Sequence, residues 1–267
     1  MTQISILGCG WLGLPLAKTL MNHSYQIKGS TTSENKIAVL ENSGISPFLI
    51  AVSENGISGN FADFLEGSDI LIIDIPPKLR AAKPENFVSK IGNLISFIEK
   101  STVSKVLFIS STSVYADDNA VVTEIQIPNP DNESGRQLYA AENLLLENAM
   151  FETTILRFGG LIGADRHPIK FLAGKQNLEN QDGPVNLIDQ KDCIGIILEI
   201  VRQQCWNEVF NAAAPFHPSR KKYYSDKATS LQLPLPQFNT EKKSVGKTID
   251  SQKLISALNY EFIEKEL

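Results

Sequence analysis

Short runs of apolar residues alternate with longer segments of helical period through the first 160 residues of the chain. The pattern predicts strands at residues 4–7, 25–29, 47–52, 69–75, 103–110 and 153–157, with helices at 11–21, 34–41, 84–100 and 136–150 between them. The run at 69–75 is nearly all apolar and stops at Pro76-Pro77, which is typical of a buried central strand. This alternation predicts an α/β protein with a parallel sheet covered by helices.

The regular alternation weakens after Gly160. Loops rich in Gly, Asn, Asp and Pro are interspersed with one helix, at 193–202, and one strand, at 208–211. We therefore expect residues 1–160 to form the core and residues 161–267 to form a small C-terminal lobe on the substrate side that also completes the sheet. Residues 119–133 show no sustained period and are expected to form a loop over the site.

A glycine-rich turn follows the first predicted strand and opens the first predicted helix. The residues Gly8-Cys9-Gly10-Trp11-Leu12-Gly13 match G-x-G-x-x-G, and this context makes the match specific for a dinucleotide. Gly8 permits the tight turn, Gly10 leaves room for a pyrophosphate, and Gly13 lets the helix pack closely on the strand. Trp11 and Leu12 begin the helix whose N-terminus faces the phosphates, so residues 1–160 are interpreted as a dinucleotide-binding core.

The end of the second predicted strand indicates which dinucleotide is bound. A site for NAD places an acidic residue there to bind the ribose 2′-hydroxyl. This chain has Ser30, Thr31 and Thr32 instead, with Lys36 nearby and no acid before Glu34. Hydroxyl groups tolerate a 2′-phosphate, so we expect NADP as the cofactor, with NAD as the other possibility.

Charge and composition exclude several classes of partner. The net charge of −5 and the pI near 5.4 argue against nucleic acid. No apolar run approaches the ~18 residues of a membrane helix, and the N-terminus lacks the features of a signal peptide. The three cysteines have neither metal-site nor redox-pair spacing. We expect a cytoplasmic protein with a small-molecule substrate and no metal, membrane or nucleic-acid partner; the oligomeric state is left open.

Three segments carry a resemblance to a known family. Residues 106–115, Val-Leu-Phe-Ile-Ser-Ser-Thr-Ser-Val-Tyr, resemble the end of the fifth strand in the extended short-chain dehydrogenase/reductases, which include sugar-nucleotide epimerases and dehydratases. Residues 155–163 and 186–192 resemble two later segments of the same family. The resemblance implies a Rossmann-type doubly wound sheet. Because the glycine spacing departs from the family's G-x-x-G-x-x-G, the chain is most similar to an atypical, epimerase/dehydratase-like branch.

The resemblance also implies roles for individual residues. Ser111 takes the place of the hydroxyl that contacts the reacting carbonyl, and Ser110 is its neighbour on the cofactor side. The substrate side of the site is expected to include Tyr115 and Arg166. Pro76 and Pro77, which end the central strand, are expected beside the cofactor.

The family's catalytic Tyr-x-x-x-Lys pair is missing, and two alignments of the following helix compete. In the first, Ser134 stands at the tyrosine position and Leu138 at the lysine position. In the second, Tyr139 is the tyrosine and Asn143 replaces the lysine. We favour the first, which keeps five identities with the family and makes Ser134 a substrate-side residue.

Without that lysine, nothing in the motif lowers the pKa of a tyrosine toward neutrality. We expect a reductase or epimerase-like enzyme that acts on a small polar or nucleotide-linked substrate. The alternative is a non-catalytic NADP-binding regulator or scaffold.

Overall fold

The computed structural model describes residues 1–77, 79 and 84–265. Its centre is a seven-stranded sheet in the order β12-β9-β7-β6-β1-β2-β3. Every pair of neighbouring strands in this sheet is parallel. The strands are β1 (Gln3–Leu7), β2 (Gln26–Thr31), β3 (Ser46–Leu49), β6 (Ile70–Ile73), β7 (Lys105–Ser111), β9 (Glu152–Phe158) and β12 (Val209–Ala212).

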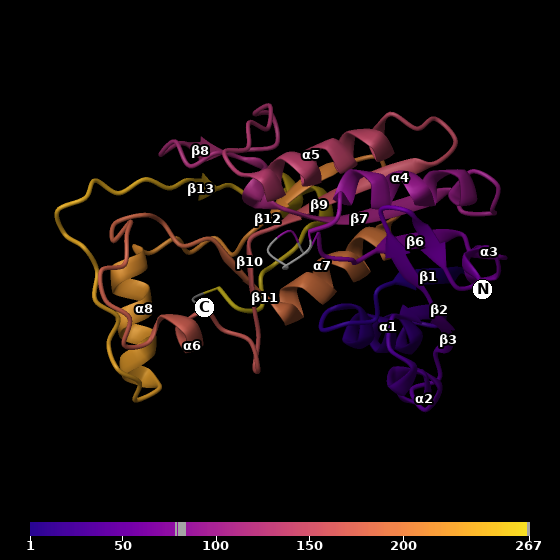
Figure 1. Cartoon of the computed structure of the whole chain (residues 1–267), viewed down its shortest axis with the longest axis horizontal. Coiled ribbons are helices and arrows are strands. Elements are labelled where there is room, and N and C mark those ends of the chain that lie inside the picture. Colours follow the sequence, from indigo (N-terminus) through magenta and orange to yellow (C-terminus); the bar gives the residue numbers. More distant parts are fainter. Residues whose placement is uncertain (78, 80–83, 266–267) are drawn as a thin grey trace.

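Helices cover both faces of the sheet (Figure 1). One hydrophobic cluster joins the sheet to α1 (Gly13–Asn22), α2 (Ile37–Glu41), α7 (Gln190–Gln203) and α9 (Gln252–Leu258). A second cluster joins the opposite face to α3 (Phe61–Leu65), α4 (Phe87–Ile98) and α5 (Glu133–Leu146). The predicted α/β class with a doubly wound parallel sheet therefore describes the molecule.

The central strands are apolar on both sides because both of their faces are buried. In β6, Ile70 and Ile72 face the first cluster, whereas Leu71 and Ile73 face the second. All four side chains are at most 1% exposed. The two-residue period of a strand thus divides one continuous apolar run between two cores.

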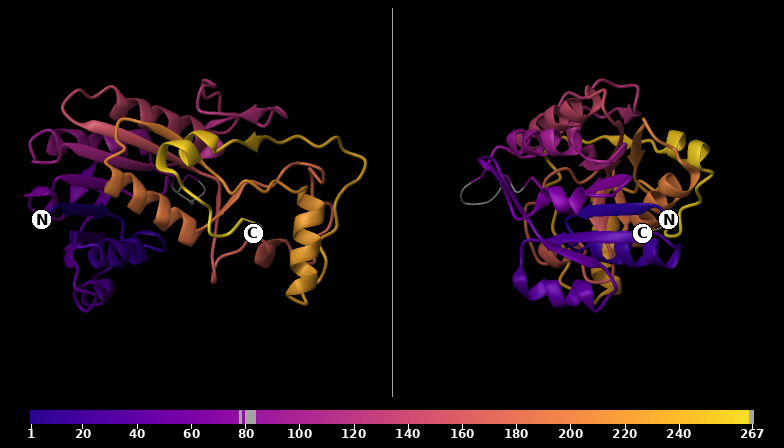
Figure 2. Two further views of the ribbon diagram at one scale, coloured as in Figure 1. Left: turned by 180° about the vertical axis from the view of Figure 1, so that it is seen from behind. Right: turned by 90° about the vertical axis from the view of Figure 1, so that its right-hand side faces the viewer.

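A smaller group of elements lies beyond one end of the sheet, opposite the N-terminus (Figure 2). It contains α6 (Ile169–Leu172) and α8 (Arg220–Ser230), which share a third cluster that includes Tyr223 and Tyr224. The chain reaches it through β10 (Gly160–Ile162), which pairs with β11 (Leu187–Asp189). The later elements α7 and β12 return to the main sheet. The domain boundary at residue 160 stays a prediction.

Several predicted elements differ from the observed ones. The strand predicted at 47–52 is two strands, because β4 (Ala51–Ser53) turns away from the sheet to pair with β5 (Gly56–Ser58). The helix predicted at 136–150 ends at Leu146, since the Asn148 side chain accepts a hydrogen bond from the backbone of Met150 in a competing turn. The strand predicted at 69–75 ends at Ile73, which places Asp74 at its carboxyl end.

The segment expected to be a loop over the site, 119–133, contains the short strand β8 (Val121–Val122). This strand pairs in parallel with β13 (Thr248–Ile249), close to the C-terminus. The pairing is a long-range contact that local periodicity does not reveal. In the described part of the chain, no helix has both the length and the apolar character needed to cross a membrane.

Candidate functional site

The carboxyl ends of β1 and β6 lie side by side where the order of the sheet reverses. From β1 the chain proceeds through β2 and β3 on one side, and then crosses to β6, β7, β9 and β12 on the other. The backbone N–H of Asp74, just after β6, donates to the carbonyl of Leu7 at 2.9 Å. Doubly wound sheets bind ligands in the crevice at this reversal.

The glycine-rich turn occupies this position, and its glycines have different reasons to lack a side chain. Gly8 has φ +111°, and a Cβ there would lie 2.3 Å from the carbonyl oxygen of Asp74. A Cβ on Gly13 would lie 2.2 Å from the carbonyl oxygen of Gly8. A Cβ on Gly10 would meet no described atom within 4 Å. Gly8 and Gly13 therefore build the turn, whereas Gly10 keeps space open in front of it.

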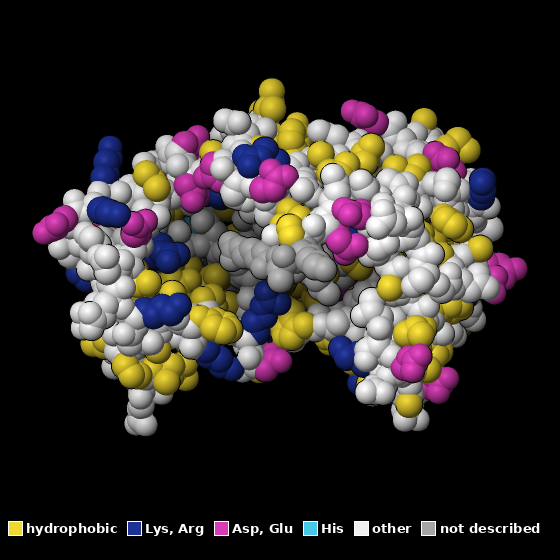
Figure 3. All heavy atoms as spheres, viewed as in Figure 1, with side chains coloured by type: hydrophobic (Ala, Val, Ile, Leu, Met, Phe, Trp, Pro, Cys, Tyr) yellow, Lys and Arg dark blue, Asp and Glu magenta, His cyan; other side chains and the backbone are white. Residues whose placement is uncertain are grey.

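Two cavities adjoin at this turn, where both are lined by Gly10, Asp74, Ile75 and Pro76, and together they are called the cleft. The first, of about 280 Å³, is lined by Leu7, Gly8, Cys9, Gly10, Ser30, Thr31, Thr32, Lys36, Ile50, Val52, Asp74, Ile75, Pro76 and Lys90. The second, of about 610 Å³, is lined by Gly10, Trp11, Leu12, Asp74, Ile75, Pro76, Pro77, Ile109, Ser110, Ser111, Ser113, Ser134, Leu138, Phe158, Gly159, Gly160, Leu161 and Arg166. In Figure 3, several Lys and Arg side chains gather on the half of the molecule that carries α6 and α8.

The end of β2 forms part of the first cavity, but its hydroxyl groups are not equivalent. Ser30 is 2% exposed, and its Oγ accepts a hydrogen bond from the backbone N–H of Gly8 at 2.9 Å. Thr31 Oγ1 accepts from the N–H of Ser33 at 3.1 Å. Thr32 is exposed at the rim. Ser30 therefore supports the turn from beneath, whereas Thr32 is exposed to solvent at the margin of the cavity.

Two lysines line the same cavity. Lys36 lies in the turn η1 (Glu34–Lys36) that precedes α2, and Lys90 lies in α4. The Lys90 ammonium forms an ion pair with Glu85 at 2.6 Å, and its side chain is only 10% exposed. Lys90 was not identified from the sequence, because a lysine on the apolar face of a predicted helix carries no local signal for a site.

The second cavity contains a group of serines. Ser111 is the last residue of β7, and its Oγ accepts the backbone N–H of Ser113 at 3.1 Å. Within the described residues, no hydrogen bond takes up the Ser111 hydroxyl proton. Ser134, in the first turn of α5, lines the same cavity. The Ser111 side chain thus lines the cavity, and its hydroxyl has no hydrogen-bond acceptor among the described residues.

The far wall of the second cavity combines Trp11 with the loop after β10. The Trp11 indole N–H donates to Asp165 Oδ1 at 2.8 Å. The guanidinium of Arg166 lies over the Trp11 ring, 5.0 Å from its centre, and Arg166 is exposed. These contacts hold the Arg166 guanidinium beside the glycine-rich turn and direct the Trp11 ring toward the loop after β10. Leu12, in contrast, is 3% exposed and belongs to the core beneath the cavity.

A buried polar network lies behind the serines. Glu142 is fully buried and Arg157 is 4% exposed, and their closest N–O distance is 2.6 Å. Ser110 Oγ donates to Glu142 at 2.5 Å. The Arg157 guanidinium donates to the Tyr115 hydroxyl, which in turn donates to Asn211 Oδ1 at 3.1 Å. The hydroxyl groups of Ser110 and Tyr115 are therefore engaged inside the protein.

The structure places Tyr115 in the core rather than in the cleft. Its side chain is 3% exposed, does not belong to the described lining of the cleft, and packs in the second hydrophobic cluster. The resemblance implies a position near the substrate, whereas in the structure the Tyr115 hydroxyl accepts a hydrogen bond from Arg157 in β9. We therefore omit Tyr115 from the site and describe Ser110 as support for Ser111.

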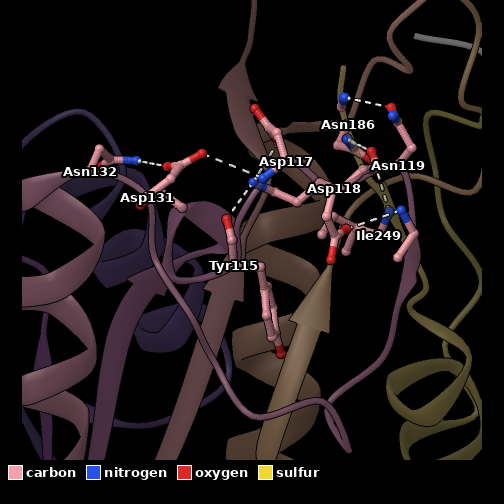
Figure 4. Close-up of polar contacts among 12 residues, drawn as sticks. Tyr115, Asp117, Asp118, Asn119, Asp131, Asn132, Asn186 and Ile249 are labelled. Carbon is pink, nitrogen blue, oxygen red and sulfur yellow. Dashed lines mark hydrogen bonds and ion pairs between the residues drawn. The ribbon is translucent and has the colours of Figure 1, made fainter. Parts of the chain in front are cut away.

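Loop 115–132, next to the site, is held by the C-terminal segment (Figure 4). Asn119 exchanges hydrogen bonds with Gly246, and Lys247 donates to the Tyr115 carbonyl and to Asp117. Asn186 accepts the backbone N–H of Ile249 at 2.9 Å. In Figure 4 the Tyr115 ring points away from these polar residues, toward the interior.

The two alignments of α5 place different side chains in the cleft. Ser134 and Leu138 line the second cavity, whereas Tyr139 packs against the second hydrophobic cluster. A Cβ on Gly135 would lie 2.1 Å from the carbonyl oxygen of Ser113, so the first turn of α5 abuts the helical turn η2 (Thr112–Val114) that follows β7. Met150 lies beyond the helix and is 67% exposed.

Asp74 is a residue of the cleft that sequence reasoning missed. It lines both cavities, and burial raises the pKa of its carboxyl to about 7, against the lowering effects of the Gly13 N–H and Arg166. The predicted strand 69–75 placed it inside the sheet. The signal in the sequence was the pair Pro76-Pro77. Prolines end a central strand, so the polar residue shortly before them lies at the carboxyl end of the sheet.

Comparisons with known proteins agree with this architecture. No known protein-family model matches the chain. It is 33% identical over 264 residues to protein YeeZ of Escherichia coli (strain K12), covering 98% of this chain and 96% of that protein.

Solved structures share the fold. UDP-glucuronic acid 4-epimerase from Bacillus cereus, in complex with UDP-glucuronic acid and NAD, is similar with a TM-score of 0.78 and 18% identity, over 97% of this chain and 94% of that one. A short-chain dehydrogenase/reductase superfamily protein from Agrobacterium tumefaciens with bound NAD has a TM-score of 0.77 and 16% identity, over 97% and 92%. The expected Rossmann-type fold is thereby confirmed.

Proposed function

This chain belongs to the family of protein YeeZ. We propose that it binds NADP(H) along the cleft. We propose further that it acts as a reductase or epimerase-like enzyme on a small polar or nucleotide-linked substrate. The observation that carries the proposal is the open space in front of Gly10, at the reversal of the sheet, between two joined cavities. Short-chain dehydrogenase/reductases with bound NAD share this fold, which supports the proposal.

The residues present fit a dinucleotide. Gly8 and Gly13 shape the turn, Gly10 leaves its backbone accessible to a pyrophosphate, and the N-cap residue of α1, Leu12, forms no side-chain hydrogen bond to the N–H groups of the helix. The first cavity would receive the adenosine half, and the second the nicotinamide half. When bound, the nicotinamide supplies or accepts a hydride.

The first cavity favours NADP over NAD. Asp74 is the only acidic residue in its described lining, and it lies at the turn rather than at the end of β2. Thr31, Thr32, Lys36 and Lys90 surround the region where a 2′-substituent would lie. The Lys36 ammonium group, together with that of Lys90, which is paired with Glu85, attracts a phosphate at this position.

We expect at least a tenfold preference for NADPH over NADH, about 1.4 kcal/mol. Thr31→Asp should narrow or reverse the preference for NADPH, because the carboxylate repels the 2′-phosphate. The aspartate side chain also keeps an acceptor for the Ser33 N–H, so the turn should stay intact. Thr31→Asn keeps the same acceptor without the charge and serves as the control. The preference is measured as the ratio of the two dissociation constants, and equal wild-type affinities would contradict it. Ser30 is unsuitable for this test, since its Oγ supports Gly8.

The chemistry on the substrate side depends on Ser111. Because its oxygen accepts the Ser113 N–H, its proton can be donated to a carbonyl oxygen in the second cavity. Ser134 lies on the same cavity wall, and Arg166 can bind an anionic group of the substrate. These residues would orient the substrate and stabilise developing negative charge on its oxygen.

Ser111→Ala is expected to lower turnover about 10²-fold, because it removes a donor to the developing oxyanion. Tyr139→Phe is the matched control, since this ring packs in the core and should change turnover less than about threefold. Steady-state kinetics with a turned-over carbonyl substrate provide the measurement. Loss of activity in Tyr139→Phe with a mild Ser111→Ala would contradict the assignment and favour the second alignment of α5.

A non-catalytic NADP-binding regulator is the second candidate. The observation that favours it is that Asp74 and Arg166 are the only ionisable side chains in the described lining of the second cavity. No Tyr–Lys pair is therefore present there to transfer a proton. NADPH affinity that is unaffected by Ser111→Ala, together with no oxidation of NADPH by any of a panel of carbonyl and nucleotide-sugar substrates, would support this candidate over the enzyme.

A further inference from the structure

Asp74 places a carboxyl group at the N-terminus of α1, in the region where the pyrophosphate of the proposed cofactor would bind. A Cβ on Gly13 would lie 3.3 Å from Asp74 Oδ2. Helix α1 has no side-chain cap at Leu12 and no acidic residue in its first turn. The Asp74 carboxyl, from the neighbouring strand, thus occupies the region that attracts negative charge.

Two anions cannot share this region without repulsion. Asp74 is the only acidic side chain in the described lining of either cavity, and it borders both of them at the turn. A pyrophosphate seated on Gly8 to Gly13 would bring its negative charge against the carboxylate. We propose that Asp74 contacts the bound pyrophosphate as a neutral carboxyl, so that dinucleotide binding takes up one proton. This inference rests on the proposed cofactor site.

The environment of Asp74 in the free protein supports the proposal. Burial raises its pKa to about 7, while the Gly13 N–H and Arg166 act to lower it. A bound pyrophosphate adds negative charge and raises that pKa further. Above about pH 7 the free carboxylate must therefore gain a proton for the ligand to bind. Affinity should fall by up to tenfold for each pH unit in this range.

The other charged and titratable groups around Asp74 come from the glycine-rich turn, η1, α4, α7 and the loop after β10. Cys9 in the turn has its pKa raised to about 12 by burial and by Asp74, and the pKa of Cys193 in α7 is raised well above its usual value by burial. Among the described residues, the cations that line the cleft are Arg166, Lys36 and Lys90, and the last of these is paired with Glu85. These cations attract the pyrophosphate, and their positive charge disfavours protonation of Asp74. They therefore do not account for the expected loss of affinity as the pH rises.

The test uses ADP-ribose, which carries the pyrophosphate but no 2′-phosphate and no nicotinamide. Its binding to the whole protein is titrated calorimetrically between about pH 6 and about pH 9. Wild-type affinity should fall at least tenfold over this range. Asp74→Asn replaces the carboxyl by an isosteric neutral amide. The affinity of this variant for ADP-ribose should change less than about threefold over the same pH range, and it should exceed that of the wild type at the highest pH. Asp69→Asn, at the opposite end of β6, should follow wild type.

Proton uptake is measured on the wild-type protein itself, without any variant. Near pH 8, the heat of binding in buffers of different ionisation enthalpy should give about one proton taken up for each ADP-ribose. Binding without proton uptake, or an unchanged pH slope in Asp74→Asn, would overturn the inference and leave the cofactor site in place. No binding of either ADP-ribose or NADPH at any pH would overturn the cofactor site, and this inference with it.

Discussion

Gly10→Val is expected to abolish dinucleotide binding while the protein stays folded. A side chain at this position meets no described protein atom within 4 Å and projects into the open cleft. It would therefore fill the space that the pyrophosphate needs without disturbing the turn. The expected loss of NADPH affinity is about 10³-fold, or about 4 kcal/mol. Titration calorimetry gives the affinity, and circular dichroism with thermal unfolding reports the fold.

Gly92 in α4 provides the matched control for Gly10, because a Cβ there also meets nothing within 4 Å. Gly92→Ala should leave both NADPH affinity and the circular dichroism spectrum unchanged. If Gly10→Val bound NADPH as wild type does, the cofactor could not lie against this turn. Gly8→Val would not test the same point, since a Cβ there clashes with the carbonyl of Asp74 and would unfold the turn.

Glu142→Ala is expected to lower the free energy of unfolding by about 3–5 kcal/mol, because it leaves the Arg157 guanidinium buried without its partner. Glu142 is fully buried and accepts three hydrogen bonds from Arg157 and one from Ser110. Urea unfolding followed by circular dichroism measures the change. A loss below about 1 kcal/mol would show that Arg157 finds other partners or water.

The same helix offers a control for this variant. Glu133 pairs with Arg136 in the first turn of α5, with both side chains more than half exposed. Glu133→Ala should leave the unfolding midpoint unchanged, because exposed ion pairs contribute little. Ser110→Ala removes one hydrogen bond of the network and should destabilise the protein far less than Glu142→Ala.

The parts of the site that are local in sequence could be predicted, and the parts that depend on distant contacts could not. The strand, turn and helix around Gly8 to Gly13 are contiguous, so their pattern alone indicates a βα turn. The position of Ser111 at a strand end follows in the same way from an apolar run and its limit. These features need no knowledge of which strands are neighbours.

Asp74 and Tyr115 show what local patterns leave out. Asp74 belongs to the cleft only because β6 is paired with β1, which is a property of sheet order. Tyr115 follows a site-like motif, yet Arg157 in β9 and Asn211 in β12 engage its hydroxyl in the core. Ser30 likewise lies at a strand end, but its position beneath Gly8 is set by the pairing of β2 with β1.

Helix α8 was missed for a different reason. Its eleven residues, 220–230, are mostly charged or polar, and only Tyr223, Tyr224 and Ala228 are buried. The helix therefore has little amphipathic pattern to detect. Its packing depends on α6 and on the third hydrophobic cluster, whose other members come from elsewhere in the chain.

A crystal structure of the protein with NADPH would locate the cofactor. We expect one cofactor along the cleft, with its pyrophosphate on the turn from Gly8 to Gly13, its 2′-phosphate near Thr31 and Lys36, and its nicotinamide in the cavity of Ser111. Cofactor density elsewhere on the molecule, or a cleft free of density in crystals that are saturated with NADPH, would contradict it.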